Sequence, residues 1–166
     1  DEQLDDYDRR RALEDELTLM IGGMTRSQSM MESELRGIWN QLVGLNSVAR
    51  HLAPDAFDRF YRDVKVMLQH YEPLDDAQRA IALEVVELTK RATEERNRVV
   101  HALWMPHFND PDAWVQLQLG NKRRAASDGG EAVRTLADVS KSVEQLKDAA
   151  LRAGFLRSAL MVMTSP

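Results

Sequence analysis

A stripe of apolar residues along the first third of the chain constrains the fold more than any other sequence feature. Its members recur every three or four positions, and the stripe keeps its phase through Gly22 and Gly23. Apolar residues at this spacing share one face of an α-helix. They are Leu13, Leu17, Met20, Met24, Met31, Leu35, Ile38, Leu42 and Leu45. The pattern predicts one long helix, weakened at the glycine pair because each glycine costs about 1 kcal/mol relative to alanine in a helix.

A second helix is predicted to follow Pro54, which suits a first helical turn, and to end before Pro73. Its apolar face consists of Phe57, Phe60, Tyr61, Val64, Met67, Leu68 and Tyr71. A third helix is predicted from Asp75 and Asp76, whose carboxylates suit a helix N-terminus, to Trp104, before Pro106. The apolar stripe of this third helix consists of Ile81, Val85, Leu88, Ala92, Val99 and Leu103.

The helical pattern stops after Pro106 and resumes only beyond Gly130. In between, Trp114, Val115, Leu117 and Leu119 are interleaved with glutamines in a strand-like pattern, and Gly120-Asn121 can form a turn. A last helix is predicted from about Thr135, with its continuation past Gly154 forming a turn or a short extra helix. Its stripe consists of Leu136, Val139, Val143, Leu146 and Ala150.

Together these segments predict an all-α fold, an up-and-down bundle of four to five helices with a long first helix. The region at about 106–130 is expected to form one irregular, hairpin-like insertion. The 166 residues are expected to form a single domain, with residues 1–8 and 120–131 mobile. No apolar run approaches the roughly 18 residues of a membrane span, so no membrane partner is expected.

The composition excludes several kinds of chemistry and leaves others open. The chain has no cysteine, which excludes thiolate metal sites and a thiol nucleophile and fits a cytoplasmic location. The net charge of −5 resides entirely in residues 1–16, which hold eight acidic residues against three arginines. The remaining chain is neutral, so a polyanionic partner such as RNA is compatible with it.

The third predicted helix carries a second, polar surface away from its apolar stripe. With Val99 set at zero and about 100° per residue, Arg96 falls near 60°, Asn97 near 160° and His101 near 200°. Val100 and Trp104 lie beside them, near about 100° and 140°. A helix surface that combines apolar groups with hydrogen-bond donors is typical of a subunit interface or a ligand cleft.

The segment Arg96-Asn97-x-x-x-His101, followed by the small residue Ala102, resembles the signature motif of the HEPN superfamily. The resemblance implies a helical bundle that pairs into a homodimer, in which the two motif copies face each other and form a metal-independent ribonuclease site. Members of the superfamily serve in toxin–antitoxin and phage-defence systems, and others are inactive binding modules. A cognate antitoxin or defence-system protein would then be a further partner.

The chemistry of these side chains fits RNA cleavage without a metal or other cofactor. His101 can act as a general acid or base, because the usual pKa of an imidazole, about 6.5, is close to neutral pH. Arg96 can bind the phosphate through its planar guanidinium, and Asn97, one turn before His101, can orient the imidazole. Two copies of each residue in a homodimer would provide both the acid and the base. Val100 and Trp104 are the predicted dimer contacts.

Other assignments complete the hypothesis. Arg98 and the loop residues Lys122, Arg123 and Arg124 are candidate RNA contacts, although such a basic loop is more often simply solvated. No metal site is expected, because no paired spacing of metal ligands occurs around His101. The alternative function is a non-catalytic helical module that uses the same surface to dimerise or to bind a partner protein or a nucleotide. A purely structural role is also open, in which Arg96 forms an interhelical salt bridge and His101 is a surface histidine with a packed ring edge.

Overall fold

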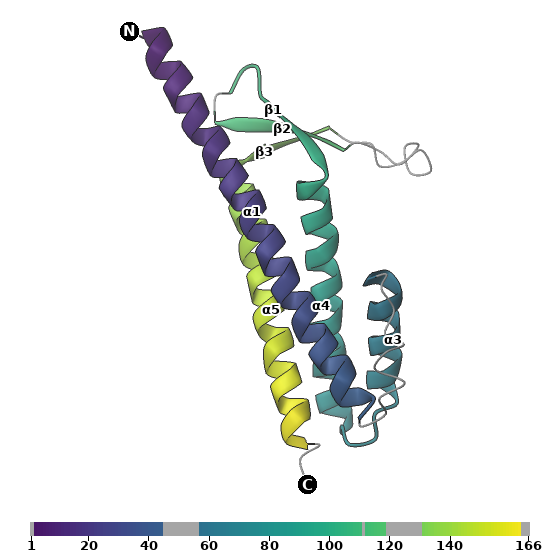
Figure 1. The fold of residues 1–166 in the computed structure, drawn as a ribbon. Coiled ribbons are helices and arrows are strands. Elements are labelled where there is room, and N and C mark those ends of the chain that lie inside the picture. The colour runs from purple at the N-terminus through teal and green to yellow at the C-terminus, as the bar shows by residue number, and fades with distance from the viewer. Residues whose placement is uncertain (1, 45–56, 111, 119–130, 164–166) are drawn as a thin grey trace. The chain divides into compact units, whose positions relative to one another are not determined.

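The structure is a computed structural model that describes residues 2–44, 57–110, 112–118 and 131–163 (Figure 1). In this part of the chain, four helices and three strands follow one another, so the fold is mostly helical but includes a small antiparallel sheet. The elements are α1 (Glu2–Leu42), α3 (Phe57–Gln69), α4 (Asp76–Val100), β1 (Ala102–Pro106), β2 (Ala113–Gln118), β3 (Glu131–Thr135) and α5 (Leu136–Met163).

The elements are divided between two compact units. One unit, called here the sheet unit, consists of Asp1–Arg26 and Glu94–Gln145 and contains the three strands. The other, called the helical unit, consists of Ser27–Thr93 and Leu146–Pro166. Helices α1, α4 and α5 each contribute residues to both units.

The helical unit is built around one apolar core, in which the predicted helical faces meet. Leu35 and Ile38 of α1 are fully buried there, as are Val64 and Leu68 of α3. The apolar face predicted for α3 is confirmed, whereas its predicted start at Pro54 lies outside the described residues. The core consists of Leu35, Ile38, Trp39, Phe60, Tyr61, Val64, Leu68, Leu74, Ala82, Val85, Val86, Ala153 and Leu160.

The apolar face predicted for α4 is confirmed in part: Val85, Ala92 and Val99 are buried, but Ile81 is not. Ile81, expected in the core, is 62% exposed, whereas Val86 and Thr89 are fully buried. Threonine can occupy the core because the Oγ1 of Thr89 donates to the Val86 carbonyl and the Oγ1 of Thr93 donates to the Thr89 carbonyl. The prediction for Ile81 was wrong because hydrophobicity alone does not reveal such satisfied hydroxyls.

The start of α4 agrees with the prediction, but its end does not. Asp75 and Gln78 form a reciprocal capping box, in which each backbone N–H donates to the other side chain. The helix ends at Val100 rather than at Trp104, and the residues after His101 form strand β1. Since Pro106 has no N–H to donate, it suits the end of this strand, which among the described strands pairs with β2 alone and so lies at an edge of the sheet.

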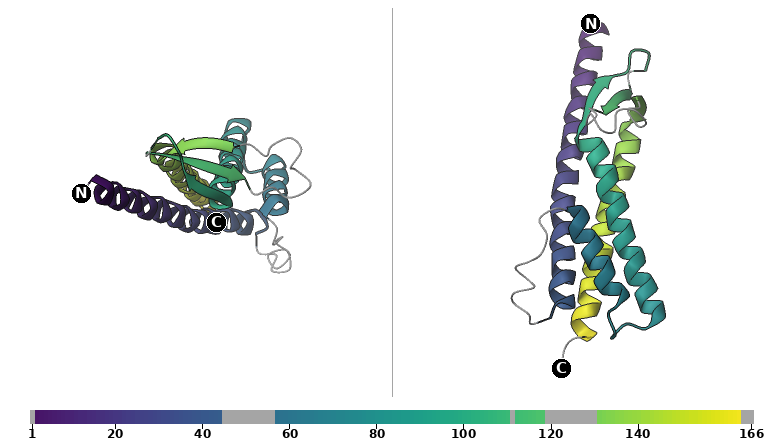
Figure 2. Two further views of the ribbon diagram at one scale, coloured as in Figure 1. Left: turned by 90° about the horizontal axis from the view of Figure 1, so that it is seen from above. Right: turned by 90° about the vertical axis from the view of Figure 1, so that its right-hand side faces the viewer.

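The sheet has the strand order β1-β2-β3, with both pairs antiparallel (Figure 2, left). The strand predicted around Trp114, Val115 and Leu117 is confirmed as β2, while Leu119 and the Gly120-Asn121 turn lie outside the described residues. Strand β1 was predicted as helix. Strand β3 was predicted as the end of a loop, because its sequence, Glu131–Thr135, lacks a run of apolar residues.

Helix α5 continues without a break to Met163, so the predicted turn or separate helix after Gly154 is wrong. Its N-terminus is capped by Thr135 and Asp138: the backbone N–H and hydroxyl of Thr135 both donate to the Asp138 carboxylate. These hydrogen bonds lower the pKa of Asp138. Gly154 is tolerated within the helix because its neighbours supply the packing of the core face, including the buried Ala153 and Leu160.

The long first helix is confirmed, and it passes through Gly22 and Gly23 without interruption. It ends near Gly44, whose φ of 60° is a left-handed conformation that glycine adopts without strain. Residues 2–8 belong to this helix, and their predicted mobility stays a prediction, whereas residues 120–130 lie outside the described ranges. Among the described helices, none is long and apolar enough to cross a membrane.

Candidate functional site

The three motif residues lie together at the C-terminal end of α4, in the sheet unit. Nη1 of Arg96 donates to Oδ1 of Asn97 over 2.9 Å. One turn later, the backbone N–H of His101 donates to the Asn97 carbonyl over 3.1 Å. Arg96 is half-buried, whereas Asn97 and His101 are exposed. The end of α4 therefore carries a guanidinium and an amide, and an accessible imidazole follows directly after the helix, one turn beyond Asn97.

Two side chains from the sheet cap this end of α4. Nε1 of Trp104 donates to the Val99 carbonyl over 2.9 Å, and Nε2 of Gln116 donates to the Arg98 carbonyl over 2.7 Å. Trp104 and Gln116 are register partners on β1 and β2, so they share one face of the sheet. Since the last carbonyls of a helix lack partners within it, these two bonds fix where α4 stops. The cap holds the motif-bearing turn against the sheet.

Glu95, the residue just before the motif, is the centre of an ion-pair cluster within the sheet unit. It accepts hydrogen bonds from Nη1 of Arg134 (2.6 Å) and from Oγ of Ser142 (2.9 Å), and Nη1 of Arg98 lies 3.3 Å away. Burial acts to raise the pKa of Glu95, but the hydrogen bonds from Arg134 and Ser142 outweigh it and hold the pKa below its usual value. The charged carboxylate ties α4 to β3 and to the first part of α5.

Some of the predicted contacts lie near this site and others cannot be placed. Arg98 is exposed and pairs with Glu95, on the turn that also carries the motif. Val100 is half-buried beside His101. Trp104 lies on β1 instead of on the helix, so its predicted position on the helix surface is wrong, and its indole N–H is used by the cap. Lys122, Arg123 and Arg124 lie outside the described residues.

Two residues that position the motif, Gln116 and Glu95, were not predicted from the sequence. Gln116 carried a signal: it lies two residues after Trp114 in the predicted strand, and residues at that spacing share a face. A glutamine on the same face as a tryptophan suggests a buried amide with a specific partner, and Gln116 is in fact only 2% exposed. Glu95 carried no such signal, because Arg134 and Ser142 are distant in sequence and only the fold brings them to it.

The outer face of the sheet, opposite the cap, is apolar and largely exposed. Met105, Val115 and Val133 form one row across the three strands, of which Val115 is buried while Met105 and Val133 are 40% and 56% exposed. Leu103, next on the same face of β1, is also exposed. Exposed apolar patches of this kind commonly mark contact surfaces. The patch begins two residues after His101.

Within the described ranges, no three histidine, aspartate or glutamate side chains gather as a metal-ion site would require. No family model, no curated protein and no solved structure matches this chain.

Proposed function

We propose that this chain is a metal-independent endoribonuclease of the HEPN type, acting as a cytoplasmic toxin or phage-defence effector. The observation that supports this proposal best is the arrangement of Arg96 and Asn97 on the last turn of α4 and of His101 directly after it, with the imidazole exposed. Its motif spacing is that of the family it resembles. The mostly helical fold is compatible with the up-and-down bundle that the resemblance implies.

In the proposed reaction, the 2′-oxygen of a ribose attacks the adjacent phosphorus, and the bond from phosphorus to the 5′-oxygen breaks. A neutral His101 takes the 2′-hydroxyl proton, and a protonated His101 gives a proton to the departing 5′-oxygen. Arg96 stabilises the charge that develops on the phosphate oxygens, and Asn97 holds Arg96 through its amide oxygen. The products are a 2′,3′-cyclic phosphate and a 5′-hydroxyl.

The need for two imidazoles makes a homodimer part of the proposal. Each chain supplies one motif, and a two-fold axis through the site would bring the acid and the base together. Val100 and the exposed outer face of the sheet, with Leu103 and Met105, are apolar surfaces next to the motif that a second copy can cover. Arg98, on the same turn, would contact the RNA backbone.

The test is incubation of the purified protein with total RNA and with transfer RNA in the presence of EDTA. Cleavage is expected for the wild type and not for the double variant Arg96→Ala/His101→Ala. His107→Ala is the matched control, since His107 lies in the same unit but outside the motif, and it should cleave normally. Equal cleavage by the double variant would contradict the proposal.

The exposed outer face of the sheet favours a second candidate function, a non-catalytic module that binds a partner protein. Met105 and Val133 are exposed apolar side chains on one face of the sheet, and such patches commonly mark protein contact surfaces. In that case neither the wild type nor the motif variants would cleave RNA. Replacement of Val133 by lysine would then abolish partner binding or dimerisation, whereas the Arg96→Ala/His101→Ala variant would retain it.

A further inference from the structure

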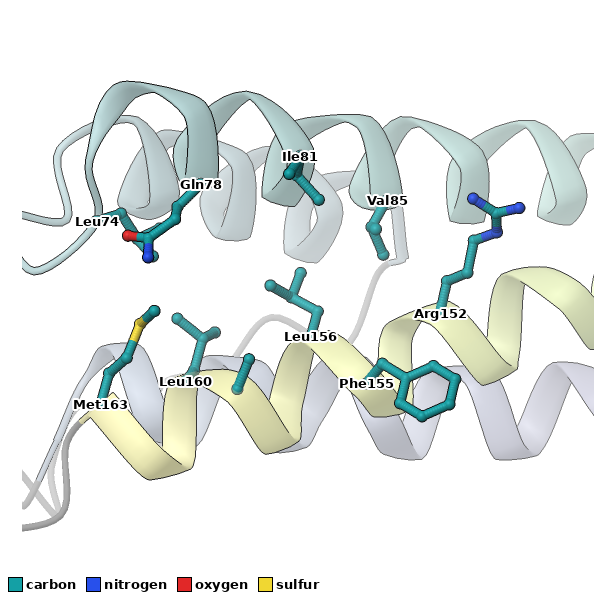
Figure 3. Close-up of a pocket in the computed structure, with 10 residues that line it drawn as sticks. Leu74, Gln78, Ile81, Val85, Arg152, Phe155, Leu156, Leu160 and Met163 are labelled. Atoms are coloured by element: carbon teal, nitrogen blue, oxygen red, sulfur yellow. The ribbon is translucent and has the colours of Figure 1, made fainter.

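The helical unit contains a groove that the proposed ribonuclease function does not use. It runs between the segment from Leu74 to Val85, which includes the start of α4, and the second half of α5, from Arg152 to Met163 (Figure 3). Its volume is about 340 Å³. Ligand pockets in proteins usually measure about 300–1,000 Å³, so this groove suits a small molecule rather than a protein segment.

The walls of the groove are almost entirely apolar. Leu160 is fully buried at its floor, whereas Ile81 and Phe155 at its rim are 62% and 66% exposed. These two rim residues are too large and too exposed to contribute much to the core of the free protein. A bound hydrocarbon chain would remove them from water, and burial of apolar surface is the main source of affinity for such a ligand.

The groove has one charged residue, and that residue lies at one end. Arg152 stands beyond Val85 with its guanidinium extended from α5, while Gln78 and Met163 lie at the opposite end (Figure 3). Its Nε donates to Asp148 over 2.9 Å, and in the described part of the chain Nη1 and Nη2 have no partner. Because the lining of the groove includes no carboxylate, these two nitrogens can donate to both oxygens of an anionic head group.

We propose that this groove binds a medium-chain fatty carboxylate, with the carboxylate on Arg152 and the hydrocarbon chain directed along Ile81 and Phe155 toward Met163. The combination of an apolar groove with a single guanidinium at one end matches a molecule with one negative charge and an apolar tail. This function is separate from the proposed ribonuclease site, whose residues lie in the sheet unit.

A second cavity in the same unit provides an internal comparison. It measures about 430 Å³ and is lined by Met30 and Glu34 of α1 together with part of α5, including Lys147 and Arg157. Nε of Arg157 lies 3.1 Å from Oε2 of Glu34, so a carboxylate in this cavity would meet a carboxylate already in place. Arg152 is paired in the same way with Asp148, but Asp148 does not line the groove, whereas Glu34 lines the second cavity. The fatty carboxylate is therefore expected in the groove beside Arg152 and not in the cavity beside Glu34.

The test is isothermal titration of the full chain with dodecanoate below its micelle concentration, beside two related compounds. Dodecanoate should bind at one site per chain. Decanoate should bind about fifteenfold more weakly, since each buried methylene changes the Kd by about fourfold. Dodecyltrimethylammonium, which has the same tail and the opposite charge, should bind at least about tenfold more weakly than dodecanoate, because it cannot accept hydrogen bonds from Arg152. Equal binding of the ammonium compound, or no binding of dodecanoate, would overturn the proposal.

Two pairs of variants locate the site, each with circular dichroism to establish that the fold is intact. Ile81→Gln should abolish binding, whereas Met30→Gln, an equally exposed apolar residue in the second cavity, should leave it unchanged. Arg152→Gln should raise the Kd about tenfold or more, because charge-assisted hydrogen bonds are lost. Arg59→Gln, from the comparable exposed pair Arg59–Asp63, is its control. Loss of binding in Met30→Gln but not in Ile81→Gln would also overturn the proposal.

Discussion

In the helical unit, neighbouring helices meet around an apolar core with residues such as Leu35, Val64 and Leu160. Ion pairs such as Lys65–Glu87 and Glu34–Arg157 join the same helices outside this core. In the sheet unit, the end of α4 is held instead by polar contacts: Glu95 with Arg134 and Ser142, and the capping bonds from Trp104 and Gln116. An apolar core tolerates small shifts between its parts, whereas hydrogen bonds fix direction and distance. The polar arrangement lies where the proposed catalytic residues need to be oriented.

The largest effect on stability is expected from the apolar core of the helical unit. Leu35 is fully buried there, and Leu35→Ala should lower the free energy of unfolding by about 2–5 kcal/mol, because it removes buried methyl groups and leaves a cavity. Urea denaturation measures this effect. Leu19→Ala, at a position that is 75% exposed on the same helix, is the control and should change stability by less than about 0.5 kcal/mol. Similar losses in both variants would show that the core has been assigned incorrectly.

A smaller but more localised effect is expected from the ion-pair cluster of the sheet unit. Glu95→Gln keeps the size of the side chain but leaves Arg134 without its carboxylate partner, at a cost of about 1–3 kcal/mol. Amide hydrogen exchange should accelerate in the last turns of α4 and remain unchanged around Leu35. Glu84→Gln, on an exposed part of the same helix, should leave both regions unaffected. Equal acceleration of amide hydrogen exchange in both units would contradict a local role for Glu95 in the sheet unit.

Loss of the cap should have a slightly smaller effect. Gln116→Met preserves the length of the side chain but removes the donor to the Arg98 carbonyl, at a cost of about 1–2 kcal/mol. The indole N–H resonance of Trp104 should shift, because Trp104 is its register partner and caps the next carbonyl. The indole resonance of Trp39, in the helical unit, serves as the internal control. A Trp104 resonance identical to that of the wild type would mean that the two capping bonds are independent of each other.

The smallest expected effect is the dependence on pH. Because the pKa of Glu95 is lower in the folded protein than the usual value of about 4.3, its carboxylate stabilises the fold fully above that pH. This contribution is lost as the pH falls through the lower, folded pKa. The wild type should therefore lose more stability between about pH 5 and pH 3 than Glu95→Gln does. Parallel stability curves for the two proteins would show that the cluster does not act through the charge of Glu95.

The sequence predicted the parts of the molecule that rest on local periodicity. The stripe of α1, the apolar face of α3 and the alternation of β2 all follow from which residues share a face. Strand β1 was missed, because Leu103 and Trp104 fit the preceding helical stripe as well as they fit a strand. What decides between the two structures is pairing with β2, a contact between separate segments that no local pattern shows.

The candidate site likewise contains residues that the sequence predicted and residues that it did not. The sequence alone identified Arg96, Asn97 and His101, because they match a short motif in which Asn97 and His101 lie one helical turn apart. It did not identify Glu95, Gln116 or Arg134 as positioning residues, because their partners come from other strands and helices. The exposure of Ile81 could not be predicted either. The buried positions near it on α4 include Thr89 and Thr93, and hydrophobicity does not mark threonines as core residues.

The most direct test of the proposed function is the rate of cleavage of a defined RNA at saturating EDTA, with analysis of the product ends. The wild type should release 2′,3′-cyclic phosphate ends, and the single variants Arg96→Ala and His101→Ala should each be slower by about a hundredfold or more. Arg62→Ala, on an exposed position of α3, should match the wild type. Cleavage by His101→Ala at the wild-type rate, or products with a free 3′-hydroxyl, would contradict a catalytic role for the end of α4.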